Sequence, residues 1–254
     1  MNYCNSHARS SGSVIDMSKV GDFQSISAAD MGEDYRPGPG HDLNVEFWLP
    51  QAAPMYDISP NLRDYLVVPT VAFWSGVPNT NGDAVKTVDT LKFRPTDGMC
   101  MYKTFQGKGT YWNHENNTVP ELASGVIFDS YLTPVVGIPN SLKIVLLLGF
   151  CREKNPNLAQ RIDQRKVTSY SVGMNYEGYE ISSTGDVVSN MAEAARAITQ
   201  PNQSPYPDEY GSLVFRYLRN PRGFECSAVP TPAFASAVGD TIMDMSDGST
   251  RNYR

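Results

Sequence analysis

The stretch Val167-Thr168-Ser169-Tyr170-Ser171-Val172-Gly173-Met174 is the one around which we expect the fold to be organised. Its alternating side chains predict a β-strand. Gly173 follows Ser171 by two positions, and a glycine lets the backbone turn sharply or approach a ligand closely. A serine hydroxyl at such a place could act as a nucleophile, because nearby backbone N–H groups can hold an oxyanion. An ordinary strand end has the same pattern, so a chemical role for Ser171 requires a base elsewhere in the chain.

Apolar and β-branched segments on both sides of this stretch predict further strands of one domain. The most apolar run, residues 142–150, is expected to be a core strand. Pro69 lacks a backbone donor, so residues 66–74 are expected to form an edge strand or to contain a bulge. The other predicted strands are residues 125–132, 213–218 and 224–229, together with a strand that runs into an Asn-rich loop over residues 110–117.

Three helices are predicted. A short one begins at Thr87, and a longer one begins at Asn155-Pro156, a good N-cap and first-turn pair. A third is expected to begin at Asp186, to place an apolar stripe on one face as far as Ile198, and to end before Pro201. Many strands with few helices predict a mixed α+β class, as a helix-flanked β-barrel or curled sheet. No alternation of strands and helices supports a doubly wound sheet.

The sequence predicts one folded domain with two extensions. Residues 1–61 are expected to be an irregular N-terminal extension, since they are rich in Ser, Gly and Pro. Within it, Phe47-Trp48-Leu49 is an apolar patch that either docks on the core or binds a partner. Residues 62–237 are expected to form the β-barrel domain, and residues 238–254 a polar C-terminal tail.

Composition narrows the class of protein. The chain has 254 residues, a net charge of -6 and no basic block, so no nucleic-acid partner is expected. No apolar run approaches the roughly 20 residues that span a bilayer, so no membrane association is expected. The polar N-terminus carries no signal-peptide core, so we expect the chain to stay in a cytoplasm.

The cysteines and histidines do not indicate a metal site. Four cysteines are scattered without a C-x-x-C pair and are expected to be free thiols, and only three histidines are available: Cys4, Cys100, Cys151, Cys226, His7, His41 and His114. No zinc site and no cofactor are therefore predicted. Only His114 lies within the expected domain, where a strand meets a loop. It is the candidate base for a serine, although a lone core histidine is also commonly structural.

Several short motifs occur in a fixed order: Asn79-Thr80-Asn81-Gly82-Asp83, Tyr102-Lys103-Thr104-Phe105-Gln106-Gly107-Lys108, Asn113-His114-Glu115-Asn116, Gly125-Val126-Ile127-Phe128-Asp129, a helix over 154–164, and Ser169-Tyr170-Ser171-Val172-Gly173. The closing Phe224-Glu225-Cys226-Ser227-Ala228-Val229-Pro230-Thr231-Pro232-Ala233 follows an E-x-S-x-V-x-x-P-A pattern. In this order the motifs, over residues 62–237, resemble the prohead (head-maturation) proteases of tailed bacteriophages. Val172 stands where the family more often has Met or Ile, and Gly109 where a Pro is common.

The resemblance implies a fold similar to the herpesvirus assembly proteases, a helix-flanked β-barrel, and the activity of a serine endopeptidase. It implies Ser171 as nucleophile and His114 as base, 57 positions apart, so that only the fold can bring them together. Glu225 is implied as the carboxylate that orients the imidazole. A solvated strand carboxylate fits Glu225 equally, and Asp83 and Asp129 are the other candidates. Backbone N–H groups of Val172 and Gly173 are the candidate oxyanion donors.

The resemblance further implies substrates and a location. The family cuts the major capsid protein and the scaffold or core proteins inside the prohead, so we expect an assembly component or oligomer of the host cytoplasm, prohead interior or virion. Self-cleavage after Glu33 or Glu193 is also implied, with the Glu193 site on the third predicted helix. Two alternatives stay open: a capsid structural or scaffold component that keeps the fold without activity, and an unrelated β-rich virion protein.

Overall fold

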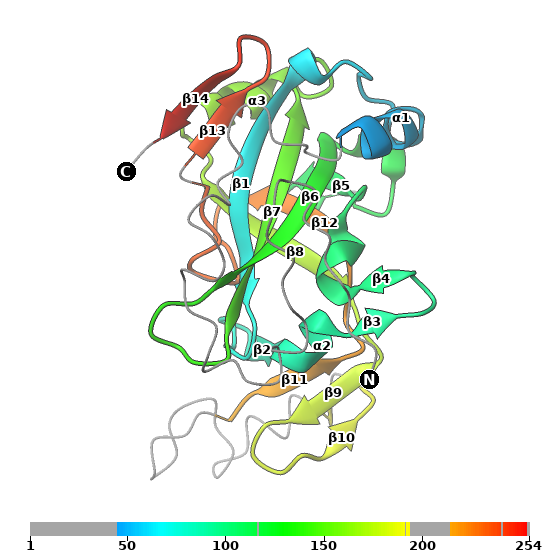
Figure 1. Cartoon of the computed structure of the whole chain (residues 1–254), viewed down its shortest axis with the longest axis vertical. Coiled ribbons are helices and arrows are strands. Elements are labelled where there is room, and N and C mark those ends of the chain that lie inside the picture. Colours follow the sequence, from blue (N-terminus) through cyan, green and yellow to red (C-terminus); the bar gives the residue numbers. More distant parts are fainter. Residues whose placement is uncertain (1–44, 116, 191, 194–213, 240, 253–254) are drawn as a thin grey trace, which may run out of the picture.

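The computed structural model describes residues 45–252, apart from residues 116, 191, 194–213 and 240, and strands dominate it (Figure 1). Its α-helices are α1 (Val45–Tyr56), α2 (Thr87–Leu91) and α3 (Pro156–Asp163), and its 3₁₀ helices are η3 (Leu62–Asp64), η4 (Met101–Phe105) and η5 (Pro120–Leu122). The strands are β1 (Tyr65–Trp74), β2 (Asp83–Ala84), β3 (Phe93–Arg94), β4 (Met99–Cys100), β5 (Gly109–Trp112), β6 (Gly125–Pro134), β7 (Leu142–Cys151), β8 (Ser169–Asn175), β9 (Gly178–Ile181), β10 (Val187–Val188), β11 (Arg216–Arg219), β12 (Arg222–Val229), β13 (Thr241–Asp244) and β14 (Ser249–Asn252).

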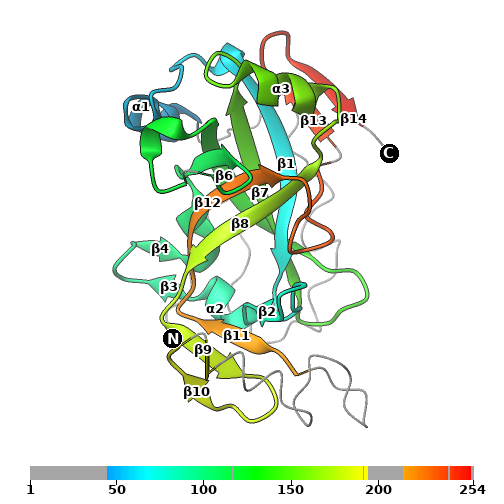
Figure 2. The same cartoon turned by 180° about the vertical axis from the view of Figure 1, so that it is seen from behind.

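In the described part of the chain, the main sheet has eight strands in the order β14-β13-β1-β7-β6-β5-β12-β8. Its neighbours are antiparallel except β5 and β12, which are parallel. The sheet curls, so that β8 and β12 cross the long strands β1 and β7 (Figure 2). A smaller sheet, β10-β9-β11-β2, lies at one end of the molecule (Figure 1).

Both faces of the central strands β1 and β7 are buried, which is why these two strands are almost continuously apolar. Leu66 and Val68 pack in one core with α3, whereas the alternate residues Tyr65 and Val67 pack in a second core with α1. The predicted strands 66–74, 125–132, 142–150 and 224–229 and the helix after Asn155 are thus confirmed. The bulge expected near Pro69 falls between Val71 and Phe73.

The main sheet is not closed by strand pairing, so the mixed class is confirmed while a barrel is not shown. One short segment that precedes β13 bonds to the edge strand β8. Residues 237–239 bond to the start of β8, through Tyr170 N to Ala237 O at 2.9 Å and Gly239 N to Thr168 O at 2.9 Å. Beyond residue 240 the chain enters β13, which pairs with β1.

The described part of the predicted N-terminal extension, residues 45–61, is packed on the domain, whereas the sequence predicts an irregular segment. The expected irregular extension contains α1, whose Leu49, Ala52 and Tyr56 are buried in the second core. Trp48 lies over Gly107, leaving no space there for a side chain. The patch at Trp48 and Leu49 therefore docks on the domain. The structure does not describe residues 1–44.

Two further expectations are wrong. Residues 238–254 were expected to be a polar tail, but β13 and β14 form a hairpin on the edge of the main sheet. The helix expected from Asp186 is replaced at its start by β10, which pairs with β9. Only Ala192 and Glu193 are helical in the described part of that segment.

Candidate active site

His114 lies in a tight turn directly after β5. Glu115 N donates to Trp112 O at 2.9 Å, and both central residues, Asn113 and His114, have positive φ values of 53° and 57°. This is the form of a type I′ turn, in which Asn is favoured at the first central position and Gly at the second. Asn113 N also donates to Ala228 O at 2.8 Å, which fixes the turn to β12. A histidine in this left-handed conformation is uncommon, which singles the position out for a functional hypothesis.

The turn brings His114 onto Glu225 of β12. The imidazole Nδ1 lies 2.8 Å from Glu225 Oε1. Glu225 is 0% exposed, whereas the His114 side chain is 38% exposed. Glu225 is therefore not a solvated surface carboxylate. When Nδ1 donates to this carboxylate, Nε2 is left as the acceptor on the open side.

The Glu225 carboxylate is itself held in place. Ser227 Oγ donates to Glu225 Oε2 at 2.6 Å, and Ser227 is fully buried. On the neighbouring strand Gly173 lies opposite Glu225, and a Cβ there would overlap Glu225 Oε1 and the Phe224 ring. Gly173 thus provides the space that the carboxylate occupies. The roles of Ser227 and Gly173 were not predicted, although the spacing in Glu225-Cys226-Ser227 places both polar side chains on one strand face.

Ser171 lies on the strand beside this pair. It is the register partner of Ser227, so Ser171, Gly173, Glu225 and Ser227 share one face of the sheet. The structure therefore brings His114 and Glu225 together and places Ser171 on the adjoining strand. Within the described residues no hydrogen bond joins Ser171 to His114.

The two candidate oxyanion donors differ in direction. Along β8, Tyr170 N points away from β12, since it donates to Ala237 O. Backbone groups alternate in an antiparallel ladder, so Val172 N–H also points to the open edge, while Gly173 N–H points toward β12. Val172 is therefore the better placed donor, and Gly173 serves the site through its missing side chain.

The two other candidate carboxylates lie elsewhere. Asp83 in β2 accepts from Arg216 Nε at 2.5 Å. Asp129 in β6 bonds to Lys103 Nζ at 3.2 Å and to the side chain of Gln106. Neither carboxylate is bonded to His114.

The electrostatics suit a base. The hydrogen bond with Glu225 raises the pKa of His114 above its ordinary value of 6.5, although partial burial of the ring opposes the rise. Cys226, whose thiol directly follows Glu225 in the sequence, is fully buried, and this burial raises its pKa well above the ordinary value. A thiol in that state is a poor nucleophile, so Cys226 does not compete with Ser171.

No cluster of three or more metal-ligating side chains occurs among the residues that the structure describes. Cys151 and Cys226 are free and buried, whereas Cys100 is disulfide-bonded, so the expectation of free thiols is wrong for Cys100. Over the described ranges, no helix is both long and apolar enough to span a membrane.

Comparison with known proteins adds no relative: no family model, no curated protein and no solved structure matches the chain.

Proposed function

We propose that this protein is a serine endopeptidase of the prohead-protease type. The observation that carries the proposal is the hydrogen bond between His114 and the buried Glu225, beside a strand that presents Ser171 on the same sheet face. A base oriented by a buried carboxylate next to a serine is the arrangement that activates a hydroxyl nucleophile.

The proposed mechanism is acyl transfer. Ser171 Oγ attacks the scissile carbonyl while His114 Nε2 accepts its proton, and Glu225 stabilises the imidazolium. The backbone N–H of Val172 stabilises the oxyanion. His114 then donates the proton to the leaving amine, and water releases the acyl group. Catalytic hydrogen bonds are often long before substrate binds, so Ser171 and His114 need bond only in the complex.

The finer fold that we propose is a barrel like that of the herpesvirus assembly proteases. The curl of the main sheet and the hydrogen bonds from residues 237–239 to β8 support it, because that segment continues into β13 beside β1. The proposed substrates are the major capsid protein and scaffold or core proteins, cut in the prohead interior within the host cytoplasm. Cleavage of the chain itself belongs to the same proposal.

The alternative is a capsid structural or scaffold component that keeps this architecture without activity. The missing bond between Ser171 and His114 among the described residues favours it. The two proposals differ in one chemical property, the reactivity of the Ser171 hydroxyl.

A serine-directed fluorophosphonate probe distinguishes them. We expect the wild-type chain to be labelled at Ser171, and Ser171→Ala and His114→Ala to lose labelling, while Ser169→Ala, altered on the same strand face, keeps it. With capsid precursor as substrate, each single variant should lose roughly 10⁴-fold in turnover, and the double variant should be little worse, because the two residues act as a unit. Precursor cleavage by Ser171→Ala at the wild-type rate would exclude the proposed nucleophile.

A further inference from the structure

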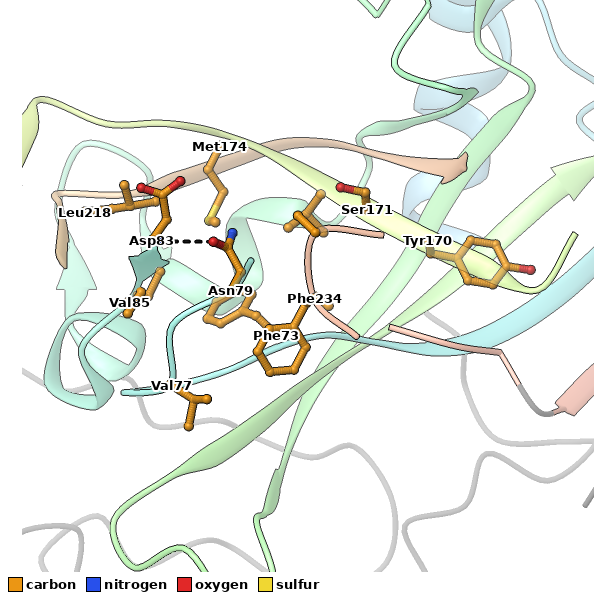
Figure 3. A pocket seen from close by; sticks show the side chains of 14 residues that line it. Phe73, Val77, Asn79, Asp83, Val85, Tyr170, Ser171, Met174, Leu218 and Phe234 are labelled. Carbon is orange, nitrogen blue, oxygen red and sulfur yellow. Dashed lines mark hydrogen bonds between the residues drawn. The ribbon is translucent and has the colours of Figure 1, made fainter. Parts of the chain in front are cut away.

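A small pocket lies along the open edge of β8, next to Ser171 (Figure 3). Val172 and Met174 line it from β8, and Phe73 at the end of β1 and Phe234 line it from other segments. Ser171 is itself among the residues that line the pocket. The proposed nucleophile and the pocket are therefore directly adjacent.

The pocket's one carboxylate and its one side-chain amide oxygen are already bonded. Asp83 accepts from Arg216, and the Asn79 side chain accepts from the backbone N of Asp83 at 3.0 Å and of Asn81 at 2.9 Å. A charged ligand group would find a carboxylate and no spare cation there. The remaining lining is mostly aliphatic and aromatic, which suits an apolar side chain.

The edge beside the pocket has the hydrogen-bonding pattern that an extended polypeptide needs. Backbone N–H and C=O groups of Val172 and Met174 point away from β12, by the same alternation that directs those of Tyr170. At Thr168 and Tyr170 this edge already bonds residues 237–239. Among the described strands none continues that pairing, since β8 is last in the order. An unpaired strand edge is a common docking place for an added strand.

We propose that an extended polypeptide pairs with β8 at residues 172–174 and inserts one aliphatic side chain, such as that of Leu or Met, into this pocket. The inference rests on the proposed function, because it gives that function its substrate-binding site. Met174 is three residues from Ser171, roughly 10 Å along a strand. The inserted side chain therefore lies within about three residues of the bond that is cut.

The test measures binding without cleavage. The full chain carrying Ser171→Ala is labelled with ¹³C-methyl methionine, and Met174→Leu assigns the Met174 signal. The probes are two pools of acetylated hexapeptides in which random residues alternate with leucine, or with aspartate. The alternation places every leucine on one face, whichever register pairs. The leucine pool should shift the Met174 signal, and the aspartate pool should bind roughly tenfold or more weakly.

Matched variants locate the effect. Ala233 lines the pocket and is half-buried, so Ala233→Trp should fill it and abolish the shift, whereas Ala235→Trp, exposed on the same loop, should not. A Met174 signal that ignores the leucine pool, or responds equally to both pools, would overturn the proposal. This comparison uses the unaltered pocket and does not depend on Ala233→Trp folding.

The two proposals fail separately. If the wild-type chain resists the fluorophosphonate while the leucine pool shifts Met174, the peptide site stands and the protease falls. If the wild-type chain cuts capsid precursor while Met174 does not respond, the protease stands and the pocket is not its substrate site.

Discussion

The Glu225 carboxylate, which orients His114, is itself positioned by two further residues. Ser227 holds the far oxygen of the Glu225 carboxylate, and Gly173 leaves room for the near one. The strained turn at Asn113 and His114 then delivers the ring to a carboxylate that is already fixed. Preorganisation of this kind lets a base act without reorienting during the reaction.

The variant Gly173→Ala tests whether the missing side chain at position 173 is needed to hold the Glu225 carboxylate against His114. The added methyl group must displace the Glu225 carboxylate or the Phe224 ring, so the bond to His114 should weaken although the backbone N–H at 173 remains. We expect a large loss of fluorophosphonate labelling and a His114 pKa, followed by NMR, that moves back toward its ordinary value. Ser169→Ala, altered on the same face of β8, is the control. Full labelling with an unchanged His114 titration would contradict this role.

Glu225→Gln tests the charge of the orienting residue. Glu225 raises the pKa of His114, and a base works when neutral, so wild-type activity should rise with pH through that raised pKa. Without the carboxylate charge the acid limb should move to lower pH, and maximal turnover should fall by roughly 10⁴-fold. The interaction between protonated His114 and Glu225 also stabilises the fold. This contribution is fully present below the pKa of histidine in the unfolded chain, and it is lost as the pH rises through the raised pKa of His114 in the folded chain. An unmoved acid limb in the pH–rate profile would argue against Glu225.

The family resemblance points to His114 and Glu225, which lie 2.8 Å apart in the structure, whereas the residues alone leave Asp83, Asp129 and a solvated Glu225 as alternatives. Sequence reasoning could not give the direction of the Val172 and Gly173 N–H groups or the packing at Gly173. Both depend on the register between β8 and β12, which contains an irregularity between Gly223 and Glu225. Register is a tertiary property that no local pattern in this chain determines.

Helix α1 shows how an element can escape prediction. Pro50 and Pro54 lie inside it, and proline ordinarily interrupts a helix, so the segment was expected to be irregular. Packing of Leu49 and Tyr56 in the second core stabilises the helix despite these residues.

Leu49→Ala should lower the free energy of unfolding by about 2–5 kcal/mol, because Leu49 is only 3% exposed in that core. Met55→Ala on the same helix, 55% exposed, should change it little. Chemical denaturation measures both variants. Equal effects would show that α1 does not contribute to the core.

The segments that were misassigned have specific physical causes. Gly185, with φ 75°, and the bond from Ile181 N to Asp186 O at 2.9 Å close a β9–β10 hairpin where a helix cap was expected. The β13–β14 hairpin is held on the sheet by pairing with β1 and by Ile242 and Met243, which are buried in the two cores, and ion pairs add to this. Arg152 bonds Asp244 at 2.6 Å, and Arg251 bonds Asp163 of α3. Neither segment has the alternating apolar pattern that identifies a strand.

For the whole molecule, the proposed self-cleavage has two expected sites. Glu33 lies outside the described residues, whereas Glu193 is exposed at a helical position. An irregular segment, which is what the sequence predicts around Glu33, enters a protease site more easily than a helical one. We therefore expect intact-mass spectrometry of wild type to show cleavage after Glu33 first and after Glu193 late or never, with Ser171→Ala remaining full length. A wild-type chain that stays intact while it cuts capsid precursor would exclude self-processing.

Strand β12 lies between β5 and β8 and is parallel to β5, so His114 and Glu225 meet across 111 residues of chain. During synthesis the N-terminal part of a protein emerges first. His114 and Ser171 therefore leave the ribosome well before Glu225, and the sheet must admit β12 before the imidazole gains its partner. A chain still being translated, and ending short of β12, lacks the oriented base. The proposed protease would thus be unable to cut neighbouring chains on the polysome that makes it.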